Sequence, residues 1–224
     1  MVGFNNSVTY GSLDEIAKEV SSCTKCELHK NRTHAVPGNG PNSCSLMFIG
    51  EAPGVNEDKL GIPFVGKAGK LLNKLLENIP IYREDIFVTN VVKCRPPKNR
   101  DPLPNEVQSC KSYLDQQINI VNPRIVVSVG RYSLLHFRPE GKISLDHGKL
   151  FHWKNRALYP IYHPAAALRN KDFFRSLDTD IKRLPEILLW SLAPGFLNFV
   201  NKDDSVIEDV SYKNQECVDE SSHE

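Results

Sequence analysis

The sequence predicts an α/β fold in which helices cover both faces of a central four-stranded parallel sheet. Short apolar runs typical of buried strands alternate four times with segments of helical periodicity, which is the order of elements around a parallel sheet. A glycine-rich stretch, residues 50–69, lies between the first such strand and its helix, a position where α/β sheets bind ligands. The 224 residues, 40% of them hydrophobic, are enough for one domain with a substantial core.

The predicted strands are four apolar runs at residues 46–49, 85–92, 124–129 and 157–162. The predicted helices cover residues 12–20, where Ser12 and Glu15 have capping-box spacing, and residues 68–79, 107–121 and 173–184, with a short helix after Gly130. Because parallel strands end at the same edge of a sheet, the loops after the first, second and fourth strands should meet there. The sequence therefore predicts one cleft that contains residues 51–64, Asn90 and His163.

Residues 50–69 combine five glycines with three acidic residues and a phenylalanine. Glycine permits backbone conformations that a side chain forbids, and it lets a ligand approach the main chain. An ordinary connection between a strand and a helix would also be rich in turn residues. The acidic side chains and the aromatic ring among the glycines favour a binding loop instead.

The formal net charge of +1 conceals an acidic C-terminal segment. Residues 201–224 hold two lysines and eight acidic residues, which leaves 26 basic and 19 acidic residues in residues 1–200. A basic body favours a polyanionic partner, whereas the acidic, Ser- and Asn-rich segment is typical of disorder. We therefore expect a functional domain over residues 1–190 and a disordered acidic tail over residues 191–224, which could bind a protein partner.

No apolar run reaches the roughly 20 residues that a membrane span requires, since Pro194 and Gly195 interrupt the run from residue 187 to residue 200. The N-terminus lacks the basic-then-apolar pattern of a secretory signal. These two features predict a cytoplasmic protein that acts without a membrane.

Four of the six cysteines have the spacing of a metal site. Cys23 and Cys26 form a CxxC pair, Cys94 follows the second predicted strand, and Cys110 lies on the apolar face of a predicted helix. Four thiolates in an intracellular protein favour zinc or an iron–sulfur cluster over disulfides. Zinc ribbons usually pair two CxxC units, so the single unit here favours iron–sulfur and leaves zinc open. The remaining two cysteines are predicted to be separate from this group.

Four motifs in this order resemble those of the family-4 uracil-DNA glycosylases, the iron–sulfur branch of that superfamily. The similarity covers about residues 10–190 and is carried, together with the four cysteines, by GEAPGVNED (50–58), GIPFVGKAG (61–69), VTNVVKC (88–94) and YHPAAALR (162–169). The resemblance implies a three-layer α/β/α fold and a structural 4Fe-4S cluster on Cys23, Cys26, Cys94 and Cys110. It also implies a monomer that binds uracil-containing DNA, single- or double-stranded, and hydrolyses the N-glycosidic bond between uracil and deoxyribose.

The resemblance implies that Phe64, Asn90 and Glu57 bind the base, which such enzymes flip out of the duplex. Phe64 would stack on the ring, and the Asn90 amide would match uracil O4 and N3–H, where cytosine offers the opposite pattern. Glu57 resembles the residue that fills the space of a C5 methyl group and so excludes thymine. Gly50 and Ala52 belong to the same binding loop.

His163 and Glu51 are the implied catalytic residues beside Asn90. His163 would donate to uracil O2 as negative charge grows on the departing base, and Glu51 would orient or deprotonate the attacking water. In the better-known branch of the superfamily an aspartate serves the water, and Ala52 occupies that position here. The share of catalysis that Glu51 carries is therefore open.

Leu168 and Arg169 are expected to contact the DNA around the flipped nucleotide. Leu168 would wedge into the hole left in the base stack, and Arg169 would hold a phosphate or the unpaired base. Further phosphate contacts are expected from basic residues near these motifs, namely Lys93, Arg95, Lys98, Arg100 and Lys171.

Two other functions account for parts of the sequence. A non-catalytic uracil sensor, like relatives that trap uracil-DNA covalently, would carry a histidine in an arginine-rich loop and glutamine in place of Ala52. No histidine lies between His34 and His136 in this chain. An iron–sulfur electron-transfer or interaction module would explain the cysteines and leave the pocket residues unexplained. Release of uracil from a labelled oligonucleotide distinguishes the three functions.

Overall fold

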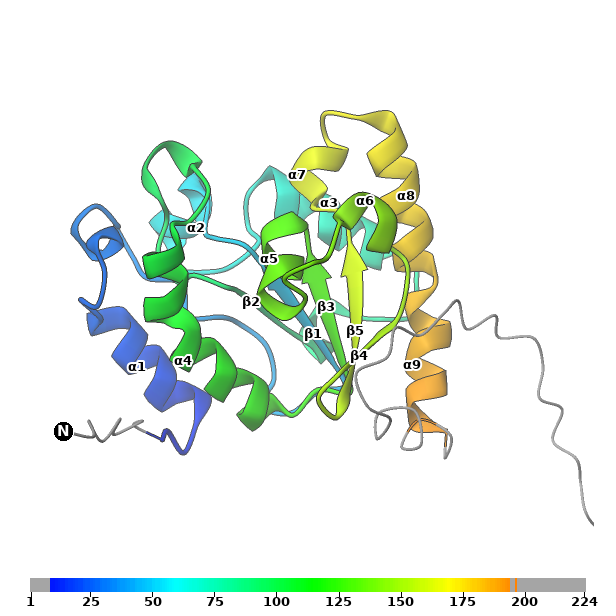
Figure 1. The fold of residues 1–224 in the computed structure, drawn as a ribbon, viewed down its shortest axis with the longest axis horizontal. Helices are drawn as coiled ribbons and strands as arrows, with labels where there is room; N and C mark the ends of the chain where they lie inside the picture. Colours follow the sequence, from blue (N-terminus) through cyan, green and yellow to red (C-terminus); the bar gives the residue numbers. More distant parts are fainter. Residues whose placement is uncertain (1–8, 194–195, 197–224) are drawn as a thin grey trace, which may run out of the picture.

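A five-stranded sheet crosses the centre of the molecule in the order β2-β1-β3-β5-β4 (Figure 1). The computed structural model describes residues 9–193 and 196. The strands are β1 (Leu46–Gly50), β2 (Ile86–Asn90), β3 (Ile125–Val129), β4 (Phe151–Trp153) and β5 (Arg156–Ile161). All four predicted strands are present, and they pair in parallel.

The sheet has one strand more than the four that the sequence predicts. The additional strand, β4, pairs antiparallel with β5 across a tight turn in which Lys154 has a φ of 53°. A run of three residues is too short to show strand periodicity, so the sequence predicts only a polar connection there. The α/β class is unaffected, because β4 extends one edge of the parallel sheet.

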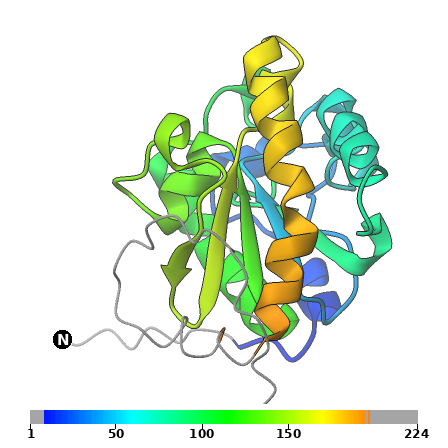
Figure 2. The same ribbon diagram turned by 90° about the vertical axis from the view of Figure 1, so that its right-hand side faces the viewer.

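Helices cover both faces of the sheet, which confirms the three-layer arrangement (Figures 1 and 2). Figure 2 shows α8 and α9 following one another along one face, in yellow and orange. The helices are α1 (Leu13–Ser22), α2 (Val55–Leu60), α3 (Lys67–Leu76), α4 (Pro104–Val121), α5 (Arg131–Phe137), α6 (Ile143–Asp146), α7 (Pro164–Ala167), α8 (Lys171–Lys182) and α9 (Leu184–Leu192). Short 3₁₀ turns cover Glu27–Lys30, Arg83–Asp85 and Pro97–Asn99.

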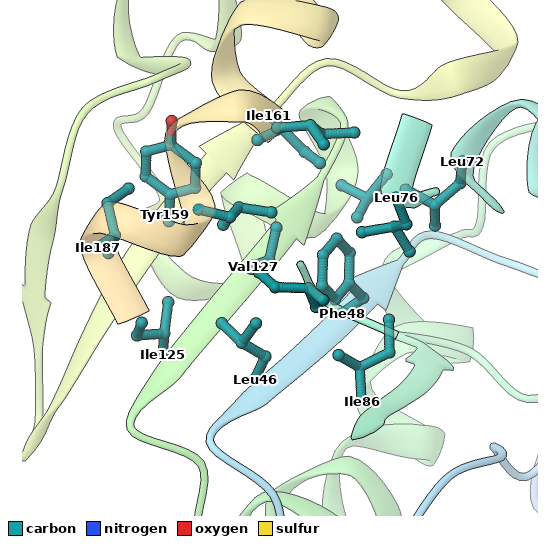
Figure 3. Close-up of a cluster of buried hydrophobic side chains, with 14 of the residues drawn as sticks. Leu46, Phe48, Leu72, Leu76, Ile86, Ile125, Val127, Tyr159, Ile161 and Ile187 are labelled. Atoms are coloured by element: carbon teal, nitrogen blue, oxygen red, sulfur yellow. The ribbon is translucent and has the colours of Figure 1, made fainter. Parts of the chain in front are cut away.

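Alternate side chains of each strand enter two separate cores, because successive residues of a strand point to opposite faces. In β1, Leu46 and Phe48 pack with α3, α8 and α9 (Figure 3), while Met47 and Ile49 pack with α1, α4 and α5. All four side chains are almost fully buried. The central strands are therefore apolar on both faces, which is the reason that they read as continuous hydrophobic runs in the sequence.

Helices α2 and α9 are not among the helices predicted from the sequence. Helix α2 lies inside the glycine-rich loop, where the polar segment VNEDKL shows no apolar periodicity; Gly54 caps its start, and Gly61, with a φ of 71°, ends it. The predicted closing helix ends at Lys182, and α9 begins at Leu184, with Pro185 in its first turn. A proline is tolerated there because the first helical N–H groups have no partner within the helix.

No helix within residues 9–193 is both long and apolar enough to cross a membrane. The acidic tail predicted for residues 191–224 lies outside the described residues, apart from 191–193 and 196.

Candidate active site

A pocket of about 640 Å³ opens at the edge of the sheet where the parallel strands end. The loops after β1, β2 and β5 meet around it, as the topology predicts, and the loop before α4 and the start of α5 complete its wall. The sequence-predicted residues that line it are Glu51, Ala52, Glu57, Phe64, Asn90, His163 and Arg169. Gly50 and Leu168 are not among the lining residues.

Gly50 lies behind the pocket wall and makes room for two of the lining side chains. It ends β1 and pairs with Asn90 at the end of β2. A Cβ atom at Gly50 would lie 2.4 Å from Asn90 Oδ1 and 2.7 Å from Phe64 Cζ, which is too close for any real contact. The absence of a side chain at this position therefore allows the amide and the ring to approach each other.

Phe64 has a left-handed backbone conformation, with a φ of 56°. Such a conformation costs a bulky residue about 1–3 kcal/mol and persists only where the surroundings fix it. Gly69, in α3, packs directly against Phe64: a Cβ atom there would lie 1.7 Å from the Phe64 carbonyl oxygen. The ring is stacked near His163, with 6.0 Å between the ring centroids and an angle of 29° between the planes.

His163 begins the short helix α7, and its ring has a defined proton arrangement. The backbone N–H of Ala165 donates to His163 Nδ1 over 3.1 Å, so Nδ1 acts as an acceptor and carries no proton. Burial lowers the pKa of His163 to about 4, while the nearby charge of Glu57 acts weakly in the opposite direction. At neutral pH the ring is therefore uncharged, with its proton on Nε2.

The carboxylate of Glu57 holds the glycine-rich loop together. It accepts backbone N–H groups from Gly54 at 3.1 Å, Val65 at 2.9 Å and Gly66 at 2.7 Å. These bonds join the start of α2 to the segment that follows Phe64. Glu57 thus shapes the pocket wall on which it lies, in addition to any contact with a base.

Glu51 is half-buried in the pocket, and its environment raises the pKa of its carboxyl group to about 7. Burial is the main cause, and the negative charge of Asp101 adds to it, while Arg131 opposes the shift. Asp101 forms an ion pair with Arg131 at 3.6 Å and accepts a hydrogen bond from the Tyr132 hydroxyl. The carboxyl group of Glu51 is consequently able to exchange a proton near neutral pH.

Sequence reasoning did not identify Asp101 and Arg131, which both line the pocket. Arg131 follows the end of β3, so it too lies at the edge of the sheet where the parallel strands end and could have been predicted on that ground. Asp101 comes from the proline-rich loop between β2 and α4, where no motif marked it. Outside the pocket, Leu168 is 52% exposed beside Arg169, a position open to a macromolecular partner.

The cysteines Cys23, Cys26, Cys94 and Cys110 line a second, narrow pocket between α1, α4 and the segment after β2. Each is an unpaired thiol, and burial raises the pKa of Cys94 and that of Cys110, the latter to about 11. Arg32 Nη1 donates to Cys94 Sγ over 3.1 Å. Cys44 is separate, since its thiol donates to the Leu46 carbonyl, and Cys217 lies outside the described residues.

Within residues 9–193, no three His, Cys, Asp or Glu side chains form a group that could hold a metal ion. The four thiols share a pocket without converging on one ion position. The chemistry of the donors nevertheless fits a soft-metal cofactor, because all are thiols and three basic side chains, Lys25, Arg32 and Lys93, line the same pocket. Positive neighbours stabilise the thiolate form that metal binding requires.

One predicted DNA contact is wrong. Lys93 is only 1% exposed and cannot reach a phosphate. Its ammonium group donates to Thr89 Oγ1, the Asn90 main-chain oxygen and Gln117 Oε1. In the sequence Lys93 stands among other basic residues and resembles a surface charge.

Arg100 is exposed and lines the pocket, and it is also paired within the protein. Its guanidinium group binds the buried carboxylate of Glu106 through two hydrogen bonds, of 2.7 and 2.8 Å. Lys98, Arg169 and Lys171 are exposed.

A comparison with protein families and a comparison with individual proteins lead to the same superfamily. The model of the uracil DNA glycosylase superfamily matches residues 37–184. A type-4 uracil-DNA glycosylase from Sulfurisphaera tokodaii is 47% identical over 188 residues, which cover 80% of this chain and 86% of that protein. The type-4 uracil-DNA glycosylase of Saccharolobus solfataricus is 44% identical over 79% of this chain and 87% of its own length. The enzyme of that name from Archaeoglobus fulgidus is 42% identical over 79% of this chain and 93% of its own length.

Proposed function

The chain belongs to the uracil DNA glycosylase superfamily, and from this premise we propose that it is a DNA repair enzyme that excises uracil from DNA. It hydrolyses the N-glycosidic bond and leaves an abasic site. The observation that carries the proposal is one pocket that contains Asn90, Phe64 and His163, each from a different segment of the chain. Together these three supply an amide, a flat apolar surface and a donor, which is what a flipped uracil requires.

Recognition of uracil rests on Asn90 and Phe64. The Asn90 amide donates to uracil O4 and accepts from N3–H, an arrangement that cytosine cannot satisfy. Phe64 stacks on the ring and has little freedom to move, because Gly69 packs against its main chain. Glu57 lies on the same wall and excludes the C5 methyl group of thymine, while its three backbone hydrogen bonds hold it in place.

His163 stabilises the leaving group. The bond between C1′ and N1 breaks, its electron pair goes to the base, and negative charge spreads to uracil O2. A neutral ring with its proton on Nε2 can donate to that oxygen, and such preorganised donors act mainly on the transition state. The hydrogen bond from Ala165 fixes the required tautomer before the substrate arrives.

Glu51 serves the attacking water. Water adds to C1′ as the base departs, and its proton passes to the Glu51 carboxylate. The carboxylate also offsets the positive charge that develops on the sugar. A carboxyl group with a pKa of about 7 is a stronger base than an ordinary glutamate, and part of it is ionised at neutral pH.

The thiols of Cys23, Cys26, Cys94 and Cys110 hold a 4Fe-4S cluster, which clamps α1, α4 and the segment after β2 together. Support comes from the shared pocket, the soft donors and the three basic side chains that line it.

The protein binds uracil-containing DNA as a monomer. Arg169 and Lys98 contact phosphates, Leu168 enters the base stack, and the acidic tail takes no part in binding DNA. The proposed function is tested by incubating the protein with a labelled oligonucleotide that contains one uracil. We expect release of free uracil and an abasic site, with no release from matched oligonucleotides that carry thymine or cytosine. An intact uracil strand would contradict the proposal.

A further inference from the structure

Lys93 is enclosed by protein between the pocket that contains Asn90 (the uracil pocket) and the pocket lined by the four cysteines (the cysteine pocket). Burial lowers the pKa of its amino group to about 7, while three acceptors around Nζ favour the charged form, because only an ammonium group has three protons to donate. Lys93 is 1% exposed, and its Nζ donates three hydrogen bonds of 2.7 Å, to Thr89 Oγ1, the Asn90 main-chain oxygen and Gln117 Oε1. An ammonium group is costly to bury, so its position must be strongly determined by its partners. These three acceptors use all three donors of the group, and none of them is a carboxylate.

One of the three acceptors belongs to the residue that reads the base. Asn90 is 2% exposed, and its side chain passes so close to Gly50 that a methyl group there would overlap it. The amide therefore has little room for adjustment from the side of β1. From the side of Lys93, the hydrogen bond to the Asn90 carbonyl fixes the main chain that carries the amide.

Lys93 also contributes to the wall of the cysteine pocket. Lys93 lines that pocket with Cys94, its neighbour in the sequence, and with Cys110 of α4. Gln117, the third acceptor, lies two helical turns further along α4 and also donates to the Pro37 carbonyl at 2.7 Å. The amino group of Lys93 is thus held by the same helix that supplies Cys110.

We propose that Lys93 is a positioning residue through which the cysteine site and the uracil pocket act on each other. This inference rests on the proposed function, since it takes Asn90 as the reader of uracil and the four thiols as cluster ligands. When the four thiols carry the cluster, the cysteine site fixes the position of Lys93, and Lys93 in turn fixes the main chain of Asn90. Because coupling between two sites is reciprocal, a base bound at Asn90 must in turn stabilise the cysteine site.

The reciprocal effect can be measured on the intact protein without an activity assay. Iron is withdrawn from the purified protein by a chelator, and the rate of iron loss is followed with and without saturating free uracil. For the wild type we expect uracil to slow iron loss by about fivefold, because opening of the cysteine site must then also overcome the coupling free energy between the two sites. In Lys93→Met, which keeps the volume and removes the charge and donors, uracil should leave the rate unchanged.

Lys111→Met is the matched control. Lys111 lies on α4 as well, but it is exposed and paired only with Asp115. In Lys111→Met, uracil should slow the loss of iron as it does in the wild type. We also expect Lys93→Met to excise uracil up to about 100-fold more slowly, as for a small displacement of a binding group, with a cooperative unfolding transition like that of Lys111→Met.

Several outcomes would overturn the inference. Coupling through Lys93 is excluded if uracil slows iron loss equally in Lys93→Met and in the wild type. It is also excluded if the wild type is active but uracil does not slow its iron loss. If Lys93→Met does not fold, the same comparison is made with Lys93→Gln, which keeps a donor without the charge and should also lose protection. If neither variant folds, Lys93 is a folding residue and the inference is wrong. A wild type that contains no iron or releases no uracil overturns the proposed function as well.

Discussion

The backbone N–H of Ala165 donates a hydrogen bond to Nδ1 of His163 across 3.1 Å. This contact places the only ring proton of the neutral histidine on Nε2. Burial keeps the ring neutral by lowering its pKa to about 4. The histidine is therefore a hydrogen-bond donor with a fixed direction over the whole physiological pH range.

The pH dependence of excision should come from Glu51, because His163 stays neutral above about pH 4. Burial and Asp101 raise the pKa of Glu51 to about 7, so the carboxylate needed as a base forms as the pH rises through that value. We expect the single-turnover rate to rise with pH, to reach half of its maximum at about pH 7 and to level off above that value.

Two variants test the assignment of this titration. Glu51→Gln should lower the rate and remove the rise, because an amide does not titrate. Asp101→Asn should move the midpoint to lower pH, since the negative charge of Asp101 raises the pKa of Glu51. Identical pH profiles for the wild type and Glu51→Gln would assign the titration to another group.

Asn90→Asp should lose activity on uracil. An ionised carboxylate cannot donate to uracil O4, whereas a protonated one can present the pattern that suits cytosine. Excision should be measured on oligonucleotides that are identical except for one uracil or one cytosine. Retention of uracil excision at the wild-type rate would show that the amide does not read the base.

Gly50→Ala should disturb the pocket, although the residue does not line it. The added methyl group would lie 2.4 Å from Asn90 Oδ1 and 2.7 Å from Phe64 Cζ, so at least one of the two must move. We expect a loss of excision rate of up to about 100-fold, the effect of a displacement of about 1 Å. Gly11→Ala is the control, because its methyl group would meet only Glu15, at the ordinary distance of 3.6 Å.

The purified protein should be brown and contain about four irons per chain, the stoichiometry of a 4Fe-4S cluster. Serine in place of Cys23, Cys26, Cys94 or Cys110 should reduce the iron content and the colour, while Cys44→Ser should leave both unchanged. Cys44 is a suitable control because its thiol donates to the Leu46 carbonyl, away from the other four. Colourless protein with one zinc ion per chain would refute the cluster.

The meeting of Glu51, Asn90 and His163 in one pocket could be predicted from the sequence, because each follows a parallel strand and such strands end at one edge of the sheet. The direction of the His163 proton could not, since it depends on how the chain turns into α7. Asp101 was missed for a similar reason: it reaches Glu51 only because the proline-rich loop folds back over the pocket.

Lys93 shows most clearly where sequence reasoning ends. Next to Arg95 and Lys98 it resembles part of a basic surface, yet it follows two buried valines and is itself buried. Its three acceptors come from β2 and from α4, where Gln117 lies 24 residues from Lys93 along the chain. The three-residue strand β4 was missed because periodicity cannot be recognised in so short a segment.

The central claim is that His163 stabilises the departing uracil, and single-turnover excision by His163→Ala tests it most directly. Removal of a donor to a developing negative charge should lower the rate by about 100-fold or more, with little change in the affinity for uracil-containing DNA, because the interaction strengthens mainly in the transition state. Excision and DNA affinity should be measured on the same preparation. A His163→Ala protein that excises uracil at the wild-type rate would contradict the account and leave this histidine with a structural role only.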